Sequence, residues 1–432
     1  MRKMISFIFL ILVSLGCSSA VTGTEKYYQD RCRSAFDENL EAKADADRAK
    51  PLVMAIFGDS IVWGQGLKER DKFWCRTKQW LELKTRRHVA HKVYAHAGAI
   101  IDEASLEKND FELLVKVDPQ GEEVNLSFPT IPQQVETAAL EYRKAGKDVD
   151  LVLIDGCIND VNFRNLLNAE RTIKDIEDRT WERCGKPMEL LLTRLTAEFP
   201  KAYVIVTGYY PIIYKGLKVE EDGKKKTVVK GSANNQLTRT AFKTLGSKNV
   251  PPRCAEDMRD CLDPLSRAWY ATSNRVLKAA VDTVKRDKGA HIYFAEMNFP
   301  PEYGFSTKQS MLWNIRFGAT NLGGLRKWVA VGLDLFRIID TNDDRWDERG
   351  KQCRTAKQAF NDRFKELVRT DALTPEQKSS VKERLRYFEF VCRRGSLGHP
   401  NRFGVALYTQ TVVGQLQAII SDTGWMTPDA AR

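Results

Sequence analysis

Histidine is scarce in this sequence, and closely spaced cysteine pairs are missing. The 432 residues include 5 His and 9 Cys, and no two cysteines stand in a C-x2-C arrangement. Structural zinc sites take about four Cys or His ligands, commonly in such close pairs. The sequence therefore argues against a zinc site, and we expect no bound metal.

The chain also has no long apolar run after its first twenty residues and no low-complexity tract. After the first twenty residues, no stretch reaches about 18 uninterrupted apolar residues, so we expect no further membrane span and a soluble remainder. Gly 27 and Pro 15 are ordinary counts, which excludes collagen-like and linker-dominated chains. With 43% hydrophobic and 29% charged residues, the composition is that of a folded globular protein.

Positive charge is in excess, but it is not concentrated in one place. Lys+Arg 68 against Asp+Glu 57 gives a formal net charge of +11 at pH 7. The two signs are interspersed, and no basic stripe alternates with aromatic residues, as nucleic-acid binding would favour. We therefore expect a basic protein with no nucleic-acid partner.

The first twenty residues have the organisation of an export signal. Arg2 and Lys3 precede an apolar segment over residues 5–15, which is too short to span a membrane. Residues 18–20 (Ser-Ser-Ala) resemble an ordinary cleavage site, whereas Gly16-Cys17 resembles the lipidation site of a bacterial lipoprotein. Both remain open, so the sequence predicts an exported protein that is secreted, periplasmic or attached to a membrane through Cys17.

The remaining cysteines form an even set behind this signal. They are Cys32, Cys75, Cys157, Cys184, Cys254, Cys261, Cys353 and Cys392. An even number of cysteines in an exported protein favours disulfide bonds. Eight cysteines allow 105 pairings, so the pattern does not select one, although Cys254 and Cys261 are near enough in sequence to close a small loop.

Short apolar runs alternate with amphipathic stretches along the chain. The runs cover 53–57, 149–154, 202–207 and 291–295, with a weaker one ending at 94–95, and the helical stretches cover 71–84, 131–144, 187–199 and 266–286. Continuous apolar runs are typical of strands buried on both faces. The alternation predicts an α/β fold with a mostly parallel sheet covered by helices.

Two stretches interrupt this alternation. Residues 217–229 read as a hairpin around Asp222-Gly223, within an insertion over about 212–264. Residues 300–390 form a longer insertion that ends in helical, highly charged sequence over 356–386. We expect one domain over residues 50–422 that carries both insertions.

Residues suited to chemistry follow the predicted strands. Ser60, in Gly58-Asp59-Ser60-Ile61, would present a nucleophile where a helix N-terminus favours an oxyanion. Gly98 and Asn159 follow the next two strands and can donate hydrogen bonds, and His399 precedes the last helix as a candidate base. Each of these residues also has a purely structural interpretation. Ser60 could cap a helix, Gly98 or Asn159 could belong to a turn, and His399 could be a packed histidine.

Taken together, these four loops resemble the GDSL or SGNH hydrolase family. The Ser, Gly, Asn and His blocks occur in the family's order. The segment after a further strand also resembles the family's sequence and reads Thr207-Gly208-Tyr209-Tyr210-Pro211. The resemblance covers about 50–210, 265–300 and 390–420. It implies a three-layer α/β/α fold, similar to flavodoxin, with a central five-stranded sheet. It also implies Ser60 as nucleophile, His399 as base, and an oxyanion hole formed by Ser60, Gly98 and Asn159.

One position departs from the family pattern. The family usually has Asp three residues before the His, where this chain has Ser396. A carboxylate there normally holds the imidazole tautomer and stabilises the imidazolium. Either a backbone carbonyl near Ser396 or a carboxylate from elsewhere, with Asp155 as a candidate, would have to orient His399. We therefore expect a Ser–His dyad.

The resemblance implies ester hydrolysis without metal or organic cofactor. An exported esterase or lipase acting on a lipid or an acylated glycan is the first interpretation. A glycan O-acetylesterase or an acyltransferase of the same fold is the alternative, and an inactive surface binding protein is the alternative of another class. Trp63, Trp313 and His96 are further candidates to line the pocket. The sequence does not indicate the oligomeric state.

Overall fold

A five-stranded parallel sheet forms the centre of the protein. The structure, a computed structural model, describes residues 50–102, 104, 121–221, 224–232, 249–317, 339–341 and 343–425. The sheet consists of β1 (Leu52–Phe57), β2 (Val89–Val93), β3 (Leu151–Ile154), β4 (Tyr203–Thr207) and β7 (Ile292–Ala295). Its order is β2-β1-β3-β4-β7, and every neighbouring pair is parallel. The predicted α/β fold is confirmed, whereas the predicted export signal over residues 1–20 lies outside the described residues.

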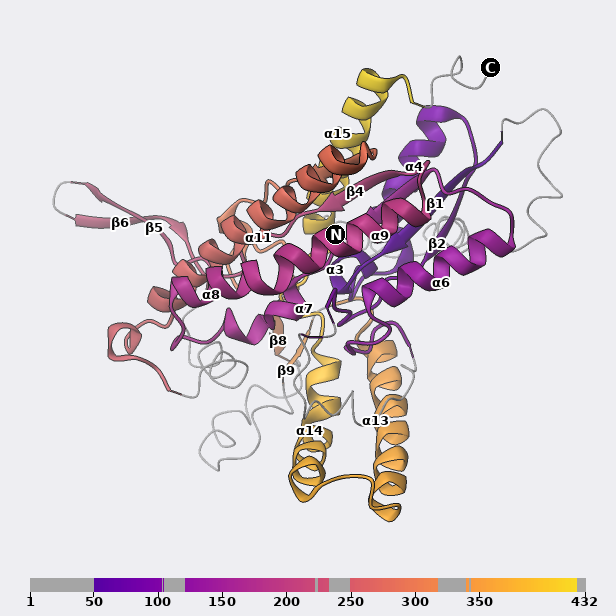
Figure 1. Ribbon diagram of the computed structural model, residues 1–432. Coiled ribbons are helices and arrows are strands. Elements are labelled where there is room, and N and C mark those ends of the chain that lie inside the picture. Colours follow the sequence, from indigo (N-terminus) through magenta and orange to yellow (C-terminus); the bar gives the residue numbers. More distant parts are fainter. Residues whose placement is uncertain are drawn as a thin grey trace, which may run out of the picture.

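Helices cover both faces of this sheet (Figure 1). The major ones are α4 (Phe73–Thr85), α6 (Ile131–Lys144), α9 (Lys186–Glu198), α11 (Arg259–Lys288) and α15 (Arg402–Thr423). Helices α6, α9 and α11 pack together on one face, and α4 packs against α15 on the other. Strands β1, β3 and β4 are buried along their whole length. Burial on both faces explains why these strands are continuous apolar runs.

Shorter elements lie between these helices and strands. They are α3 (Ser60–Trp63), η2 (Glu69–Asp71), α7 (Ile158–Val161), η4 (Phe163–Asn165), α8 (Ile173–Thr180), the π-helical turn η5 (Trp181–Gly185) and η6 (Pro252–Cys254). Helix α8, η5 and α9 follow one another without a break. Helices α3 and α7 directly follow β1 and β3, so they place their residues at the carboxyl edge of the sheet, where ligands bind in such folds.

The predicted helix boundaries are right for α6 and wrong for α11. The stretch 131–144 coincides with α6, whose first turn has a capping box between Thr130 and Gln133. Helix α11 begins at Arg259, seven positions before the predicted start at 266, and contains Pro264. Proline lacks the N–H that a helix interior needs, and for that reason the sequence pattern places the start after it.

Helix α15 is apolar enough to resemble a membrane span. It is the one helix in the described part of the chain whose length and composition would allow it to cross a membrane. Its buried side chains are Gly404, Val405, Tyr408, Val412, Leu416 and Ile419, and the helix packs against β4 and β7. The apolar sequence of α15 is therefore explained by its place over the sheet.

The first insertion contains the predicted β-hairpin. Strands β5 (Gly216–Glu221) and β6 (Lys224–Lys230) pair antiparallel with a register shift at Leu217/Lys218. The pair projects from the body of the protein (Figure 1). The hairpin prediction is confirmed, while its turn at 222–223 lies outside the described residues.

The second insertion contains a helical hairpin. It contains η7 (Pro301–Tyr303), the paired strands β8 (Ile315–Phe317) and β9 (Ile339–Thr341), and the helices α13 (Trp346–Arg369) and α14 (Pro375–Arg393). The helical sequence predicted over 356–386 is confirmed, and it is divided between two helices. Thr374 caps α14 through a capping box with Gln377, and Pro375 occupies its first turn. Proline and a capping box are strong start signals.

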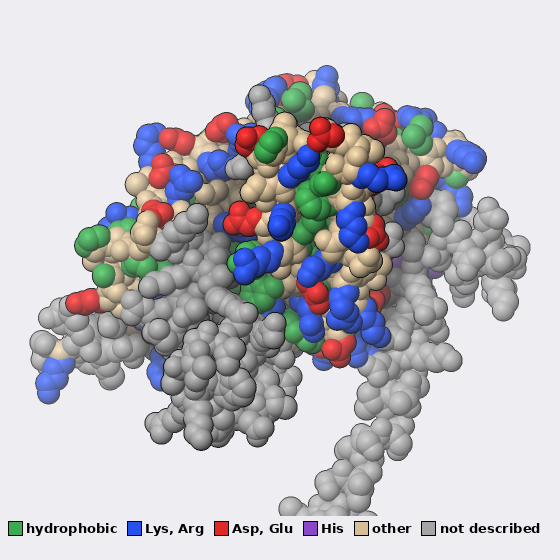
Figure 2. Space-filling model, turned by 90° about the horizontal axis from the view of Figure 1, so that it is seen from below, with side chains coloured by type: hydrophobic (Ala, Val, Ile, Leu, Met, Phe, Trp, Pro, Cys, Tyr) green, Lys and Arg blue, Asp and Glu red, His purple; other side chains and the backbone are tan. Residues whose placement is uncertain are grey.

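The hairpin of α13 and α14 has a small core of its own. Apolar side chains from both helices pack with Val124 and Leu126, and a disulfide joins Cys353 to Cys392. The hairpin projects away from the sheet (Figure 1), and Lys and Arg side chains are prominent on the face that it occupies (Figure 2). The disulfide lies where α13 begins and α14 ends, so it closes the base of the hairpin.

The expected disulfides are present. Besides Cys353–Cys392, the structure has Cys157–Cys184 and Cys254–Cys261. The small loop expected between Cys254 and Cys261 is confirmed, whereas the other two pairs could not be chosen from the sequence. Cys157–Cys184 fastens the loop after β3 to η5.

We predict that a disulfide that closes a longer loop stabilises the fold more than one that closes a shorter loop. Replacing Cys353 and Cys392 by Ser releases a loop of 39 residues, which should lower the free energy of unfolding by about 4 kcal/mol in the chain-entropy account. The matched pair Cys254→Ser with Cys261→Ser releases a loop of 7 and should cost about 2 kcal/mol. Urea denaturation of both variants measures the difference; an equal or reversed order would contradict it.

Candidate active site

Ser60 begins a short helix directly after strand β1. The Asp59 carboxylate caps α3 by accepting a hydrogen bond from the backbone N–H of Ile61 at 2.8 Å. Asp59 therefore has the capping role, and Ser60 is the first helical residue. Ser60 is 4% exposed, so its hydroxyl is held in a mostly dry environment at the carboxyl edge of the sheet.

The structure brings His399 into contact with Ser60. Nε2 of His399 lies 2.7 Å from Oγ of Ser60, although 339 positions separate the two residues in sequence. This distance is within hydrogen-bond reach of a nucleophile and its base. The imidazole is therefore placed to accept the hydroxyl proton.

Backbone pairing with the second insertion holds the loop that carries His399. The N–H of Trp313 donates to the carbonyl of His399 at 2.8 Å, and the N–H of Gly398 donates to the carbonyl of Trp313 at 3.0 Å. The Tyr210 hydroxyl, from the loop after β4, donates to the carbonyl of Gly398 at 2.8 Å. Two segments far apart in sequence thus fix the His399 backbone.

Burial makes His399 a neutral imidazole near pH 7. Desolvation, the largest effect, lowers the pKa of His399 to about 4, while the backbone carbonyls of Ser396 and Leu397 act in the opposite direction and the charge of Arg349 lowers the pKa further. Nδ1 is buried with no hydrogen-bond partner of good geometry among the described residues, so these carbonyls are not close, well-aligned partners. A neutral imidazole is the form that can accept a proton.

Two backbone N–H groups near Ser60 are available to a ligand. Neither Ser60 nor Gly98 donates its backbone N–H to any residue in the described part of the chain. Gly98 has φ of 90°, and a Cβ there would lie 2.5 Å from the backbone nitrogen of Leu126. Only glycine fits this close approach. Unpaired donors beside a nucleophile are what an oxyanion hole requires.

Asn159 lies beside the Gly98 loop, as the sequence order suggested. Its side-chain amide donates one hydrogen bond to the carbonyl of Ala99 at 2.9 Å, and an amide has two N–H groups. The neighbouring Asp160 accepts hydrogen bonds from the backbone N–H groups of Ile101 and Asp102. These bonds fix the loop after β3 against the loop after β2.

A strained residue precedes α7. Cys157 has φ of 144°, a region that L side chains rarely adopt. Its disulfide to Cys184 of η5 holds it there. Local strain of this kind persists when the surrounding structure enforces it. Cys157 is the N-cap of α7, so its backbone conformation sets the start of the helix that contains Asn159.

Asp155 supports the Ser60 loop and shares no described hydrogen bond with His399. Its Oδ1 accepts a hydrogen bond from the backbone N–H of Asp59 at 2.9 Å, and a Cβ on Gly58 would come within 2.1 Å of the same oxygen. Burial, and next the negative charge of Asp59, raise the pKa of Asp155 well above its ordinary value. Asp155 thus lies under the loop that carries Ser60, and its expected role in orienting His399 has no contact to support it.

Ser396 also does not contact the imidazole through its side chain. Its hydroxyl donates to Oδ2 of Asp343 at 2.7 Å and accepts from Nη2 of Arg349 at 3.1 Å. Arg349 also forms a buried ion pair with Glu123 at 2.9 Å. Sequence reasoning missed Asp343, Arg349 and Glu123, because none of them belongs to the four blocks that carry the family resemblance and Glu123 is 226 positions from Arg349 in the chain.

The two tryptophans and His96 belong to the packed interior. Trp63 and Trp313 are buried within the main core, and the Trp63 indole N–H donates to Glu123 at 3.0 Å. The ring nitrogens of His96 lie 2.9 and 2.7 Å from the carbonyls of Ala97 and Pro129. These contacts favour the structural interpretation of all three residues.

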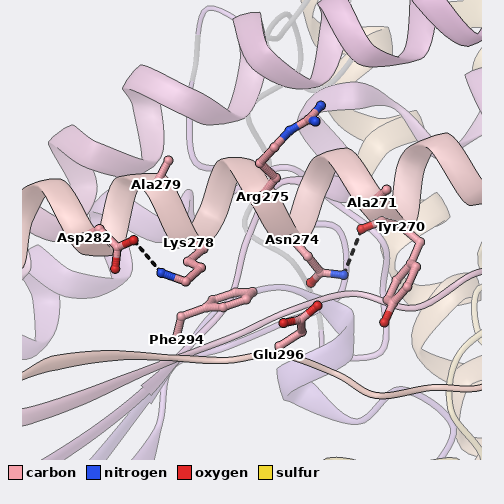
Figure 3. Close-up of a pocket in the computed structure, with 9 residues that line it drawn as sticks. All are labelled: Tyr270, Ala271, Asn274, Arg275, Lys278, Ala279, Asp282, Phe294 and Glu296. Carbon is pink, nitrogen blue, oxygen red and sulfur yellow. Dashed lines mark hydrogen bonds and ion pairs between the residues drawn. The ribbon is translucent and has the colours of Figure 1, made fainter.

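A cavity of about 380 Å³ lies between α11 and β7, away from Ser60. Tyr270, Asn274, Lys278, Phe294 and Glu296 are among its lining residues (Figure 3). Asn274 also holds the backbone of the loop after β4, so it has a structural partner there.

No group of three or more His, Cys, Asp or Glu in the described ranges could hold a metal ion.

Comparison with known proteins finds similarity in structure alone. No family model and no curated protein matches the chain. A lipase from a goat rumen metagenome is 16% identical, covering 57% of this chain and 80% of that one, with a TM-score of 0.30. A phospholipase A1 from Streptomyces albidoflavus is 13% identical, covering 63% and 91%, with a TM-score of 0.33. A carbohydrate acetylesterase from Sinorhizobium meliloti is 14% identical, covering 57% and 84%, with a TM-score of 0.28. At such values an activity must be inferred from the chain's own residues.

We predict that His399 titrates far below an ordinary histidine. Its pKa should lie about 4, because burial penalises the charged ring, so the ring is neutral above that pH and protonated below it. NMR titration of the imidazole resonances measures this value, and with 5 His in the chain the His399→Gln spectrum assigns the signal. A pKa near 6.5 would contradict the prediction.

Proposed function

We propose that the chain is an exported serine esterase or lipase that hydrolyses carboxylic esters through an acyl-enzyme on Ser60. The single observation that carries the proposal is the 2.7 Å contact between Oγ of Ser60 and Nε2 of His399. A hydroxyl at this distance from a neutral imidazole can be deprotonated as it attacks. A capping or packing serine needs no such partner.

The surrounding groups suit the steps of ester hydrolysis. His399 takes the Ser60 proton while Oγ attacks the ester carbonyl, and the negative oxygen is held by the backbone N–H groups of Ser60 and Gly98 and the Asn159 amide. His399 then gives its proton to the leaving alcohol. Water attacks the acyl-enzyme with His399 again as base, and this step restores Ser60. The side chains and backbone of this site account for each step.

Two observations support export. The described part of the chain contains three disulfides, and disulfides persist mainly in oxidising compartments. The basic and apolar pattern of residues 1–20 is that of an export signal. Lipidation at Cys17 and simple cleavage remain the two ways of processing.

The proposed substrate is an ester of a lipid or an acylated glycan. A glycan O-acetylesterase or an acyltransferase would use the same Ser60 chemistry and differ in the acyl group or its acceptor. The Ser60–His399 contact disfavours an inactive binding protein. A series of nitrophenyl esters of increasing acyl length separates these candidates: activity limited to acetate indicates an acetylesterase, and activity that rises with chain length indicates a lipase.

We predict that Ser60→Ala abolishes hydrolysis of a short-chain nitrophenyl ester, because the substitution removes the hydroxyl that would form the acyl-enzyme. The folded variant should also lose labelling by a fluorophosphonate, which reacts with activated serines. Ser379→Ala, which removes an exposed hydroxyl from α14, is the matched control and should keep both properties. Full activity in folded Ser60→Ala would remove Ser60 from its proposed role.

We predict that Asn159→Ala lowers kcat by ~10²–10³-fold, the usual cost of losing one oxyanion donor. KM should change little, since this bond strengthens as charge develops on the oxygen. Steady-state kinetics on the same ester measures both constants. An unchanged kcat would show that the amide is engaged only with Ala99 and does not reach the reacting oxygen.

A further inference from the structure

The position where the family usually has a carboxylate is connected to a carboxylate elsewhere in this chain. Ser396 stands three residues before His399, and its hydroxyl donates to Oδ2 of Asp343 at 2.7 Å. Asp343 belongs to the second insertion, 53 positions earlier in the chain. Through its hydroxyl, Ser396 thus connects the turn before His399 to a carboxylate of the second insertion.

Arg349 is the centre of this cluster. Its guanidinium donates to Glu123 at 2.9 Å, to Asp343 at 2.5 Å and to the Ser396 hydroxyl at 3.1 Å. It also donates to the carbonyl of Arg393 at 2.9 Å. The side chains of Arg349, Glu123 and Asp343 are all 0% exposed in these ion pairs. Buried charges demand such partners, because an unpaired one is strongly unfavourable.

The cluster reaches both halves of the proposed dyad. On one side, Glu123 accepts hydrogen bonds from the indole N–H of Trp63 and the backbone N–H of Gly66, and Trp63 is the last residue of the helix that Ser60 begins. On the other side, Ser396 lies in the turn that ends at His399, whose N–H donates to the carbonyl of Ser396 at 2.9 Å. One buried ionic network therefore spans from the Ser60 helix to the His399 turn.

We propose that Asp343 and Arg349, acting through Ser396, are positioning residues that take the place of the missing carboxylate and hold His399 in register with Ser60. This role rests on the proposed function. Neither residue touches the reacting atoms. They fix the turn before His399 by hydrogen bonds and set the charge beside the imidazole.

The charges around His399 indicate how the network acts on it. The groups that face its loop are Arg349 and Asp343 at the base of the hairpin, Glu123 beside them, the Tyr210 hydroxyl on Gly398, and Arg402 with Asp344 at the start of α15. The positive charge of Arg349 lowers the pKa of His399. The negative charge of Asp343 is paired with the positive charge of Arg349, and a negative charge near the ring would favour the imidazolium formed during reaction.

Asp343→Asn tests the charge directly. The amide keeps the shape of the side chain and can still accept from Ser396, but the charge that is paired with Arg349 is lost. We expect kcat to fall by ~10–10²-fold with little change in KM, since small displacements of a catalytic group have such effects. We also expect the pKa of His399, measured by NMR, to shift downward. Asp362→Asn, which removes the same charge from the exposed surface of α13, where it pairs with Lys365, is the matched control and should leave both values close to wild type.

A second substitution tests rescue. In Asp343→Asn with Ser396→Asp, a carboxylate returns to the network at the family's position and can pair with Arg349. Part of the lost kcat and the pKa of His399 should recover. A network that only stabilises the fold would change the melting temperature without this recovery.

Ser396→Ala keeps the proposal testable if Asp343→Asn does not fold, because it removes a hydroxyl and leaves both ion pairs. It should lower kcat with KM retained. Wild-type kcat, KM and His399 pKa in folded Asp343→Asn and Ser396→Ala would overturn the proposal. Failure of the proposed function is a different result, namely full activity in Ser60→Ala or no ester cleavage by the wild type. The NMR titration decides the effect of Asp343 on His399 in either case.

Discussion

The site depends on neutralising one buried arginine. Arg349 is surrounded by Glu123 and Asp343 with no exposed side-chain surface, and removing one partner of such a pair typically costs about 3–5 kcal/mol. The segments that supply these groups must therefore come together for any of them to be stable. Because the Ser396 turn is one of these segments, the same requirement that stabilises the insertion also places His399.

Close backbone approaches impose a second constraint at the edge of the sheet. Gly58 allows the Asp155 carboxyl to lie against the loop after β1, and Gly98 allows Leu126 to lie against the loop after β2. A side chain at either glycine would push these loops apart. The strands fix where the loops begin, and the glycines determine how near to one another the loops can come.

Short patterns in the sequence predict the sheet and the four loops, because each depends on residues close together in the chain. The apolar runs become β1, β3, β4 and β7, and Ser60, Gly98 and Asn159 follow strands as expected. The charged network is different. Asp343 and Arg349 lie in helical or charged sequence that reads as an exposed surface, and their burial arises only when distant segments meet. The loop that separates α13 from α14 was missed although Thr374 and Pro375 carry its signal.

The backbone pairing of Trp313 with Gly398 and His399 has a consequence for the evolution and engineering of this chain. The long segment between β7 and the last helix looks like an accessory that could be trimmed to yield a minimal hydrolase. Because this segment pairs with the backbone of the His399 loop, shortening it would remove a support of the imidazole that contacts Ser60 and leave Ser60 itself in place.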